Sequence, residues 1–171
     1  MNRLNRMGLL ASAAVILLAL VAWPSAASAC AVVSLDAIRK LFDDWNKALK
    51  TKNPETVVLL YATDAVLLPT VENGPKIGRD AIKGYFEHFL PDGPSGAIVG
   101  MRNITIGCNM AFDAGHYTFT YSPPPPKTKD PTLARYTYVY KYEGGTWLIA
   151  HHHSSVCPVL PGPGEPPVCK R

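Results

Sequence analysis

The sequence predicts an α+β domain in which helices come first and pack on one face of a curved, cone-shaped antiparallel sheet. Two observations support this fold class. Apolar residues recur with helical spacing in the first half of the chain, whereas after Gly96 they alternate with a period of two. Helices followed by antiparallel strands form a layered α+β domain, and a sheet that curves around its helices leaves a pocket at the mouth of the cone.

Three helical segments and one short strand precede the main sheet. The first helix has Ser34 as its N-cap and one apolar face, formed by Ile38, Leu41, Phe42, Trp45, Ala48 and Leu49. A second, short helix begins after Asn53 and extends to about Tyr61. The apolar run 65–70 contains a proline and predicts an edge strand, and a third amphipathic helix covers 79–90.

Four longer strands follow, each marked by alternating apolar or aromatic residues: Ile104 and Ile106; Tyr117, Phe119 and Tyr121; Tyr136, Tyr138 and Tyr140; Trp147 and Ile149. Residues 143–146 contain two adjacent glycines and predict a tight hairpin between the last two strands. Residues 122–131 contain four consecutive prolines, which lack a backbone N–H and predict a stiff, protruding loop.

Residues 1–29 have the organisation of a secretory signal peptide. Arg3 and Arg6 precede an apolar run of about 14 residues, and Ala27-Ser28-Ala29 forms an A-x-A cleavage site. A membrane-spanning helix needs roughly 20 apolar residues, so we expect cleavage and no stable membrane anchor. The mature protein is then a periplasmic or secreted domain at 30–158, followed by a proline-rich tail at 159–171. Lipidation of Cys30 is the alternative to simple cleavage.

Charge and cysteine content restrict the possible partners and the redox environment. Loss of the two signal-peptide arginines lowers the formal charge from +4 to +2. A nearly neutral domain lacks the basic surface that binds phosphates, so nucleic acid is not an expected partner. Four cysteines in an exported chain permit disulfides in three pairings. Cys30 with Cys169, joining the tails, and Cys157 with Cys169 are both compatible with the sequence.

Several motifs stand in the same order as in a known family: Trp45-x-x-Ala48-Leu49, Tyr61-Ala62-x-Asp64-Ala65, Tyr85-Phe86-x-x-Phe89-Leu90, Ala134-Arg135-Tyr136-Thr137-x-Val139-Tyr140 and Trp147-x-Ile149-x-His151-His152-His153-Ser154-Ser155. Over about residues 35–158 the chain resembles bacterial relatives of the association domain of calcium/calmodulin-dependent protein kinase type II. That domain belongs to the nuclear transport factor 2-like (NTF2-like), or SnoaL-like, superfamily. The resemblance implies a cone-shaped α+β fold that self-associates as a homodimer or a larger ring, without kinase activity. Where the association domain of the kinase has a pocket arginine near the end of the last strand, this chain has Ser154.

Three consecutive histidines on the final predicted strand are the first candidate ligand-binding residues. Side chains alternate along a strand, so His151 and His153 share one face while His152 and Ser154 share the other. A single bulge would exchange the pair that faces the pocket. Three adjacent histidines do not converge on one ion, so neither a metal site nor a cofactor is predicted.

Arg135, Tyr117 and Tyr85 complete the candidate ligand-binding residues. Arg135 begins a tyrosine-rich strand, where its guanidinium group would bind a carboxylate; an ion pair with an aspartate or a surface position is the alternative. Tyr85 and Tyr117 suit the core or an interface, although a phenol beside a histidine would also stabilise negative charge.

Two classes of function are compatible with these residues. The first is an exported domain that binds a small organic acid and forms homo-oligomers. The second is a cofactor-free isomerase, cyclase or hydrolase in which a strand histidine is the general base. The sequence offers histidines without a clear carboxylate partner, so we favour the binding domain. On this interpretation Arg135→Ala abolishes the binding of anionic ligands.

Overall fold

A computed structural model describes residues 30–122 and 132–157. The expected signal peptide, most of the proline loop and the C-terminal tail lie outside these residues. The helices are α1 (Leu35–Lys50), α2 (Pro54–Val58), α3 (Gly78–Phe89) and the 3₁₀ turn η1 (Leu90–Asp92). The strands are β1 (Tyr61–Leu68), β2 (Lys76–Ile77), β3 (Ser95–Gly107), β4 (Met110–Thr120), β5 (Thr132–Glu143) and β6 (Thr146–Val156). No helix in the described ranges is long and apolar enough to cross a membrane.

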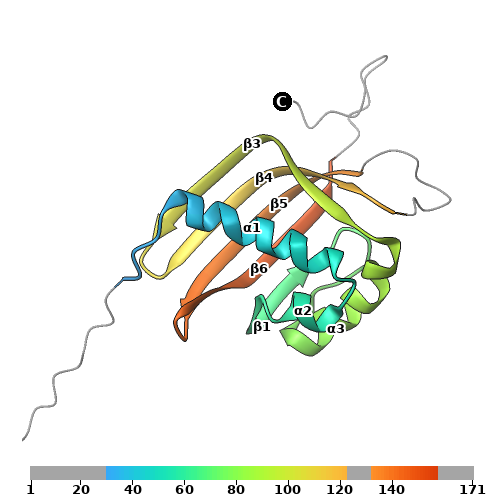
Figure 1. The fold of residues 1–171 in the computed structure, drawn as a ribbon, viewed down its shortest axis with the longest axis horizontal. Coiled ribbons are helices and arrows are strands. Elements are labelled where there is room, and N and C mark those ends of the chain that lie inside the picture. Colours follow the sequence, from blue (N-terminus) through green and yellow to red (C-terminus); the bar gives the residue numbers. More distant parts are fainter. Residues whose placement is uncertain (1–29, 123–131, 158–171) are drawn as a thin grey trace, which may run out of the picture.

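The strands form one sheet in the order β2-β1-β6-β5-β4-β3. Figure 1 shows α1 lying across the long strands, with α2 and α3 near β1 at one end of the sheet. The predicted α+β fold is confirmed, but the sheet is mixed because β1 runs parallel to β6. The expectation that the 65–70 strand forms the edge was wrong, since the two-residue β2 pairs with its outer side.

The helix starts follow the capping residues in the sequence. Ser34 accepts a hydrogen bond from the Ala37 N–H at 3.1 Å, and Asn53 accepts one from the Glu55 N–H at 3.0 Å. The second helix is shorter than expected, because the backbone leaves it at Val58 to pair with β6. The Ile149 N–H donates to the Leu60 carbonyl at 2.9 Å, so sheet pairing takes over the residues predicted as its last turn.

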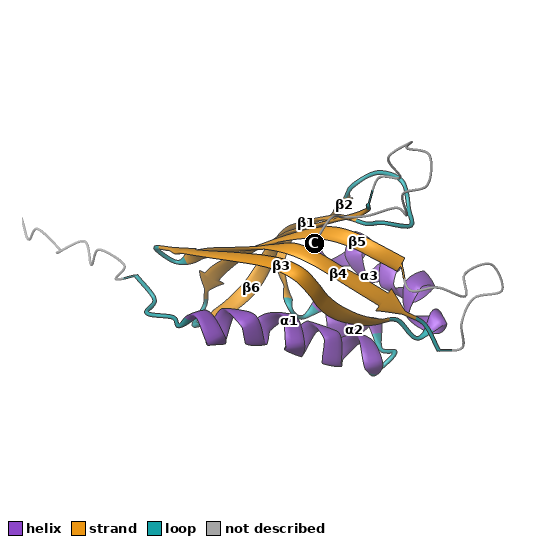
Figure 2. Cartoon of the chain, turned by 90° about the horizontal axis from the view of Figure 1, so that it is seen from above, coloured by secondary structure: helices purple, strands orange, loops and turns teal. Residues whose placement is uncertain are grey.

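The core lies between α1, α3 and the inner face of the sheet. The aromatic residues of β5, Tyr136, Tyr138 and Tyr140, point inward and are buried, so they belong to the core and not to a free surface. The Trp45 ring contacts the Tyr138 ring edge-on, with centroids 5.7 Å apart. Figure 2 shows α1 and α2 on one side of the sheet, while no helix of the described residues lies on its other face.

A disulfide between Cys30 and Cys108 fastens the segment before α1 to the β3–β4 hairpin, with 4.8 Å between the Cα atoms. The Ala31 N–H also donates to the Asn109 side chain at 2.7 Å. Of the pairings that the sequence left open, that of Cys30 with Cys169 is therefore excluded, because the start of the domain lies beside the β3–β4 turn. Cys157 is also disulfide-bonded.

Candidate functional site

A narrow cavity lies between α3 and the inner face of the sheet: its solvent-accessible volume is only about 20 Å³, and all the empty space around it, open solvent at the mouth included, is about 370 Å³. Its walls are mainly aromatic, and the lining residues are Trp45, Leu67, Pro69, Thr70, Val71, Tyr85, Phe86, Phe89, Tyr117, Phe119, Tyr121, Thr132, His152 and Ser154. No aspartate, glutamate, lysine or arginine belongs to this described lining. The cavity therefore combines an apolar wall with a few neutral polar groups, as small-molecule sites commonly do.

A bulge in β6 decides which histidine reaches the cavity. Val139 pairs with His151 while Tyr140 pairs with Ile149, so Ala150 is the extra residue on β6. After the bulge, His152 and Ser154 point inward and His151 and His153 lie on the outer face. The alternation expected within the triplet is present, and the structure resolves the face that the sequence left open.

His152 is buried among aromatic rings and hydrogen-bonded on both nitrogens. The Tyr61 hydroxyl lies 3.0 Å from Nδ1, and the Tyr117 hydroxyl lies 3.4 Å from Nε2. The Tyr138 ring stacks on the imidazole at a centroid distance of 4.1 Å. Burial, followed by the proximity of the other two histidines, lowers the pKa of His152 to about 3. The imidazole is thus neutral at physiological pH, and it is a weak base.

A chain of hydrogen bonds leads from His152 through Tyr117 to Ser154 on β6 and Thr70 in the loop after β1. Tyr117 donates to the Ser154 hydroxyl at 2.5 Å, and Ser154 is in turn hydrogen-bonded to Thr70. Burial raises the pKa of Tyr117, so its phenol keeps its proton. Tyr85 lines the opposite wall from α3, where its ring stacks on Phe89 with centroids 5.4 Å apart.

Three residues of this network were not among the sequence candidates: Trp45, Tyr61 and Thr70. The Trp45 indole donates to the Tyr61 hydroxyl at 3.1 Å, which joins α1 to the His152 side of the network. The helical spacing placed Trp45 on the buried face of α1. Its polar partner depends on the packing of α1 against β1, which no local pattern reveals.

The other candidates lie outside the cavity. Arg135, His151 and His153 are on the outer face of the sheet, where Arg135 is exposed and pairs across the strands with His116 and Ser155. Of the candidate ligand-binding residues, the structure therefore brings together Tyr85, Tyr117, His152 and Ser154. The described residues contain no group of three or more potential ligands that could hold a metal ion.

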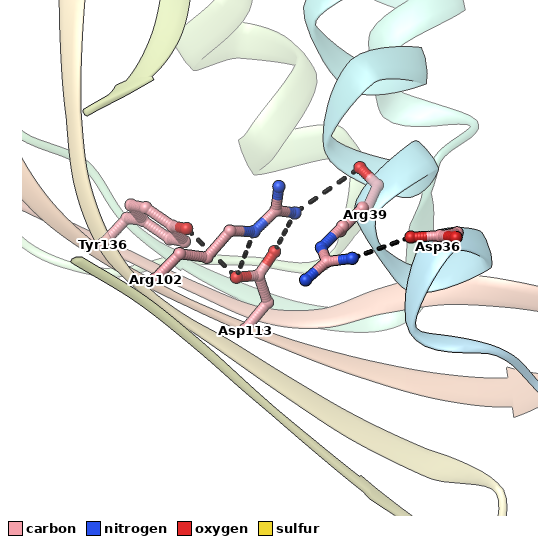
Figure 3. Close-up of polar contacts among 5 residues, drawn as sticks. All are labelled: Asp36, Arg39, Arg102, Asp113 and Tyr136. Atoms are coloured by element: carbon pink, nitrogen blue, oxygen red, sulfur yellow. Dashed lines mark hydrogen bonds and ion pairs between the residues drawn. The ribbon is translucent and has the colours of Figure 1, made fainter. Parts of the chain in front are cut away.

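A second polar cluster lies beneath the first half of α1, away from the cavity lining. Figure 3 shows Arg102 and Tyr136 converging on the fully buried carboxylate of Asp113. Arg102 donates to both carboxylate oxygens, at 3.0 and 2.6 Å, and Tyr136 donates at 3.0 Å. Because its oxygens are occupied by these donors, Asp113 acts as a structural anchor for β3, β4 and β5.

Comparison with known proteins supplies the family. The profile of the calcium/calmodulin dependent protein kinase II association domain matches residues 35–158. The chain belongs to this association-domain family. A Xanthomonas campestris protein assigned to the same family has 43% identity and a TM-score of 0.68, covering 78% of this chain and 97% of that one. No curated protein shows significant similarity to the chain.

More distant structures share the NTF2-like fold of the association domain. An NTF2-like protein of Pseudomonas putida has 19% identity and a TM-score of 0.62, with coverage of 73% of this chain and 87% of that one. A Streptomyces avermitilis protein assigned as an NTF2-like dehydratase has 11% identity and a TM-score of 0.60, with coverage of 71% and 94%. At such identities the likeness establishes the fold alone.

Proposed function

We propose that this association-domain protein is an exported binding domain for a small neutral molecule, and that it self-associates through the outer face of its sheet. The observation that carries the binding proposal is the aromatic cavity with an uncharged hydrogen-bonded network at His152, Tyr117 and Ser154. Such a lining favours an apolar or aromatic ligand body held by one or two hydrogen bonds.

The charges around the cavity favour a neutral ligand over the organic acid expected from the sequence. Arg135 lies on the outer face, and His152 has no positive charge near neutral pH because burial lowers its pKa to about 3. A carboxylate would therefore enter a nonpolar site without a counter-ion, which costs much more than burying a neutral amide. We now expect Arg135→Ala to leave ligand binding unchanged.

Two apolar residues of similar exposure, one inside and one outside the cavity lining, allow a matched test of binding in this cavity. Val71 lines the cavity and is 57% exposed, whereas Ile77 lies outside the lining and is 65% exposed. We expect saturation-transfer NMR to detect benzamide bound to the wild type and to Ile77→Trp, but not to Val71→Trp. The isosteric anion benzoate should bind less tightly than benzamide. Equal benzamide binding to both tryptophan variants would contradict a site in this cavity.

The enzymatic alternative finds less support in the geometry. A general base works best when its pKa lies near the operating pH, and that of His152 is lowered to about 3. The described cavity lining also contains no carboxylate that would act with it. The tyrosine and serine hydroxyls are better suited to hydrogen-bond a bound molecule than to abstract a proton.

Self-association is supported by the family and by the uncovered face of the sheet. This face carries Phe112, Val139 and His151 in one row across β4, β5 and β6, and Phe112 is 44% exposed. We expect Val139→Asp to shift the protein to monomers in light scattering. Leu59→Asp changes an apolar residue that is 62% exposed on the helical side and should leave the oligomer intact. A monomeric wild type would contradict this part of the proposal.

A further inference from the structure

The hydrogen bonds that lead into the cavity have a fixed direction, set at their buried end by Trp45. An indole N–H is a donor only, so the Tyr61 oxygen accepts it at 3.1 Å. The other described partner of the Tyr61 hydroxyl is His152 Nδ1, at 3.0 Å. Donation from Tyr61 to Nδ1 satisfies all three groups, whereas the reverse direction leaves the Tyr61 proton buried without an acceptor.

The donor-to-acceptor direction of the hydrogen bonds is kept across His152, because its neutral imidazole accepts at one nitrogen and donates from the other. A neutral imidazole has one N–H, and with Nδ1 accepting from Tyr61 the proton is on Nε2. Nε2 lies 3.4 Å from the Tyr117 hydroxyl, which therefore accepts from His152. Tyr117 in turn donates its own proton to Ser154 at 2.5 Å. Each hydrogen bond in this chain, from Trp45 on α1 to Ser154 on β6, is therefore donated in the direction of the cavity.

One hydroxyl proton is left over at the cavity end. Ser154 and Thr70 carry two protons between them, and only one is used in the hydrogen bond that joins the two hydroxyls. No described group accepts the other proton, and both side chains line the cavity. The cavity therefore presents a hydrogen-bond donor, and an apolar ligand that buries this donor unpaired loses binding free energy.

We infer that the cavity selects neutral, largely apolar molecules that carry a hydrogen-bond acceptor, such as the carbonyl group of a ketone, aldehyde or ester. The carbonyl oxygen takes the proton left over at Thr70 and Ser154, and the rest of the molecule packs against aromatic residues from α3 and β4. This inference rests on the proposed ligand-binding function and adds the chemical group that the site recognises.

The direction of the network can be tested without any ligand. We expect long-range ¹H–¹⁵N correlation spectra of the intact mature protein to show His152 protonated on Nε2 and unprotonated on Nδ1 at neutral pH. The exposed His88 provides an internal reference. A His152 ring protonated on Nδ1 would reverse the direction and overturn the inference, even if small molecules bind.

The ligand preference can be tested with acetophenone and α-methylstyrene, which have the same shape and differ by an oxygen in place of a methylene group. The measured quantity is the ratio of their dissociation constants, compared between the wild type and Thr70→Val/Ser154→Ala. We expect the double variant to lose about tenfold of the preference for the ketone, the value of one hydrogen bond. Thr70→Val alone should keep most of it, because Ser154 still has a proton to donate.

The outcomes separate the two proposals. An unchanged ratio in a folded double variant would overturn the acceptor inference while leaving binding in the cavity intact. Failure of both probes to bind the wild type, with benzamide also failing, would overturn the binding function together with the inference. Circular dichroism establishes folding, and if the double variant unfolds, the protonated nitrogen of His152 in the wild type remains the measurement that can overturn the inference.

Discussion

The properties of individual residues in this domain depend on which face of the sheet they occupy. His152 and His153 are adjacent, yet the first is buried against Tyr138 while the second is exposed. The sequence predicted their opposite orientations from the strand period, but not which one faces inward. The bulge at Ala150 decides this, and the local sequence contains no signal for it. Arg135, for which the sequence left a pocket and a surface position open, lies on the outer face because it alternates with the inward-facing Ala134 and Tyr136 along β5.

The buried histidine makes stability depend on pH. In the unfolded chain His152 has a pKa of about 6.5, whereas burial lowers it to about 3 in the folded protein. The unfolded state therefore binds more protons between these values, and stability falls as the pH drops below about 6.5. At pH 5 the free energy of unfolding should be about 2 kcal/mol lower than at pH 7.5 from this group alone.

Urea unfolding at the two pH values measures this effect. His152→Gln removes the titrating group and should reduce the difference in unfolding free energy, whatever its effect on stability at neutral pH. His88→Gln changes an exposed histidine and serves as the matched control. An identical pH dependence in wild type and His152→Gln would show that the buried imidazole does not control acid stability.

Asp113 provides a second test at the residue scale. Asp113→Asn keeps the shape but leaves Arg102 without its buried counter-charge, so we expect a loss of about 2–4 kcal/mol in unfolding free energy. The Asp36–Arg39 pair on α1 is exposed on both sides, and Asp36→Asn should cost less than about 1 kcal/mol. Chemical denaturation at neutral pH measures both; equal costs would contradict a structural role for the buried cluster.

At the scale of elements, periodicity and capping predicted helices and strands well where each element is long. The period-two segments after Gly96 became β3 to β6, and Ser34 caps α1 as expected. Short elements were less predictable, because tertiary pairing decides them. Tyr61, expected at the end of the second helix, instead begins β1, where it pairs with Ile149 of β6.

The close contact between β3 and β4 predicts that a larger residue in place of Gly115 will destabilise the domain. β3 is irregular between Val99 and Arg102, where Gly115 of β4 lies opposite. A Cβ atom on Gly115 would come within 2.3 Å of the Met101 carbonyl oxygen. We expect Gly115→Ala to lower the unfolding free energy by about 1–3 kcal/mol, because backbone atoms must shift.

Gly84 provides the control for this change, since it lies in α3 and a Cβ atom added there would meet nothing within 4 Å. Gly84→Ala should raise stability by up to roughly 1 kcal/mol through helix propensity. Thermal unfolding followed by circular dichroism distinguishes the two variants. A Gly115→Ala protein as stable as Gly84→Ala would show that the strands are not as closely packed as described.

At the scale of the whole molecule, the α+β fold and its family follow from the sequence, whereas the chemistry of the cavity does not. The tyrosines and histidines were visible as candidates, but their grouping required the curvature of the sheet and the placement of α1 and α3 (Figure 1). The absence of charge from the described lining emerged only from that arrangement, and it changed the expected ligand from an organic acid to a neutral molecule.

Native mass spectrometry of the mature protein, purified gently from the periplasm, tests the central claim most directly. We expect the wild type and Ile77→Trp to retain a small neutral molecule with a carbonyl group, and Val71→Trp, which narrows the cavity mouth, to lose it. A retained molecule that is anionic, or that stays bound to Val71→Trp as tightly as to the wild type, would contradict neutral-ligand binding in this cavity.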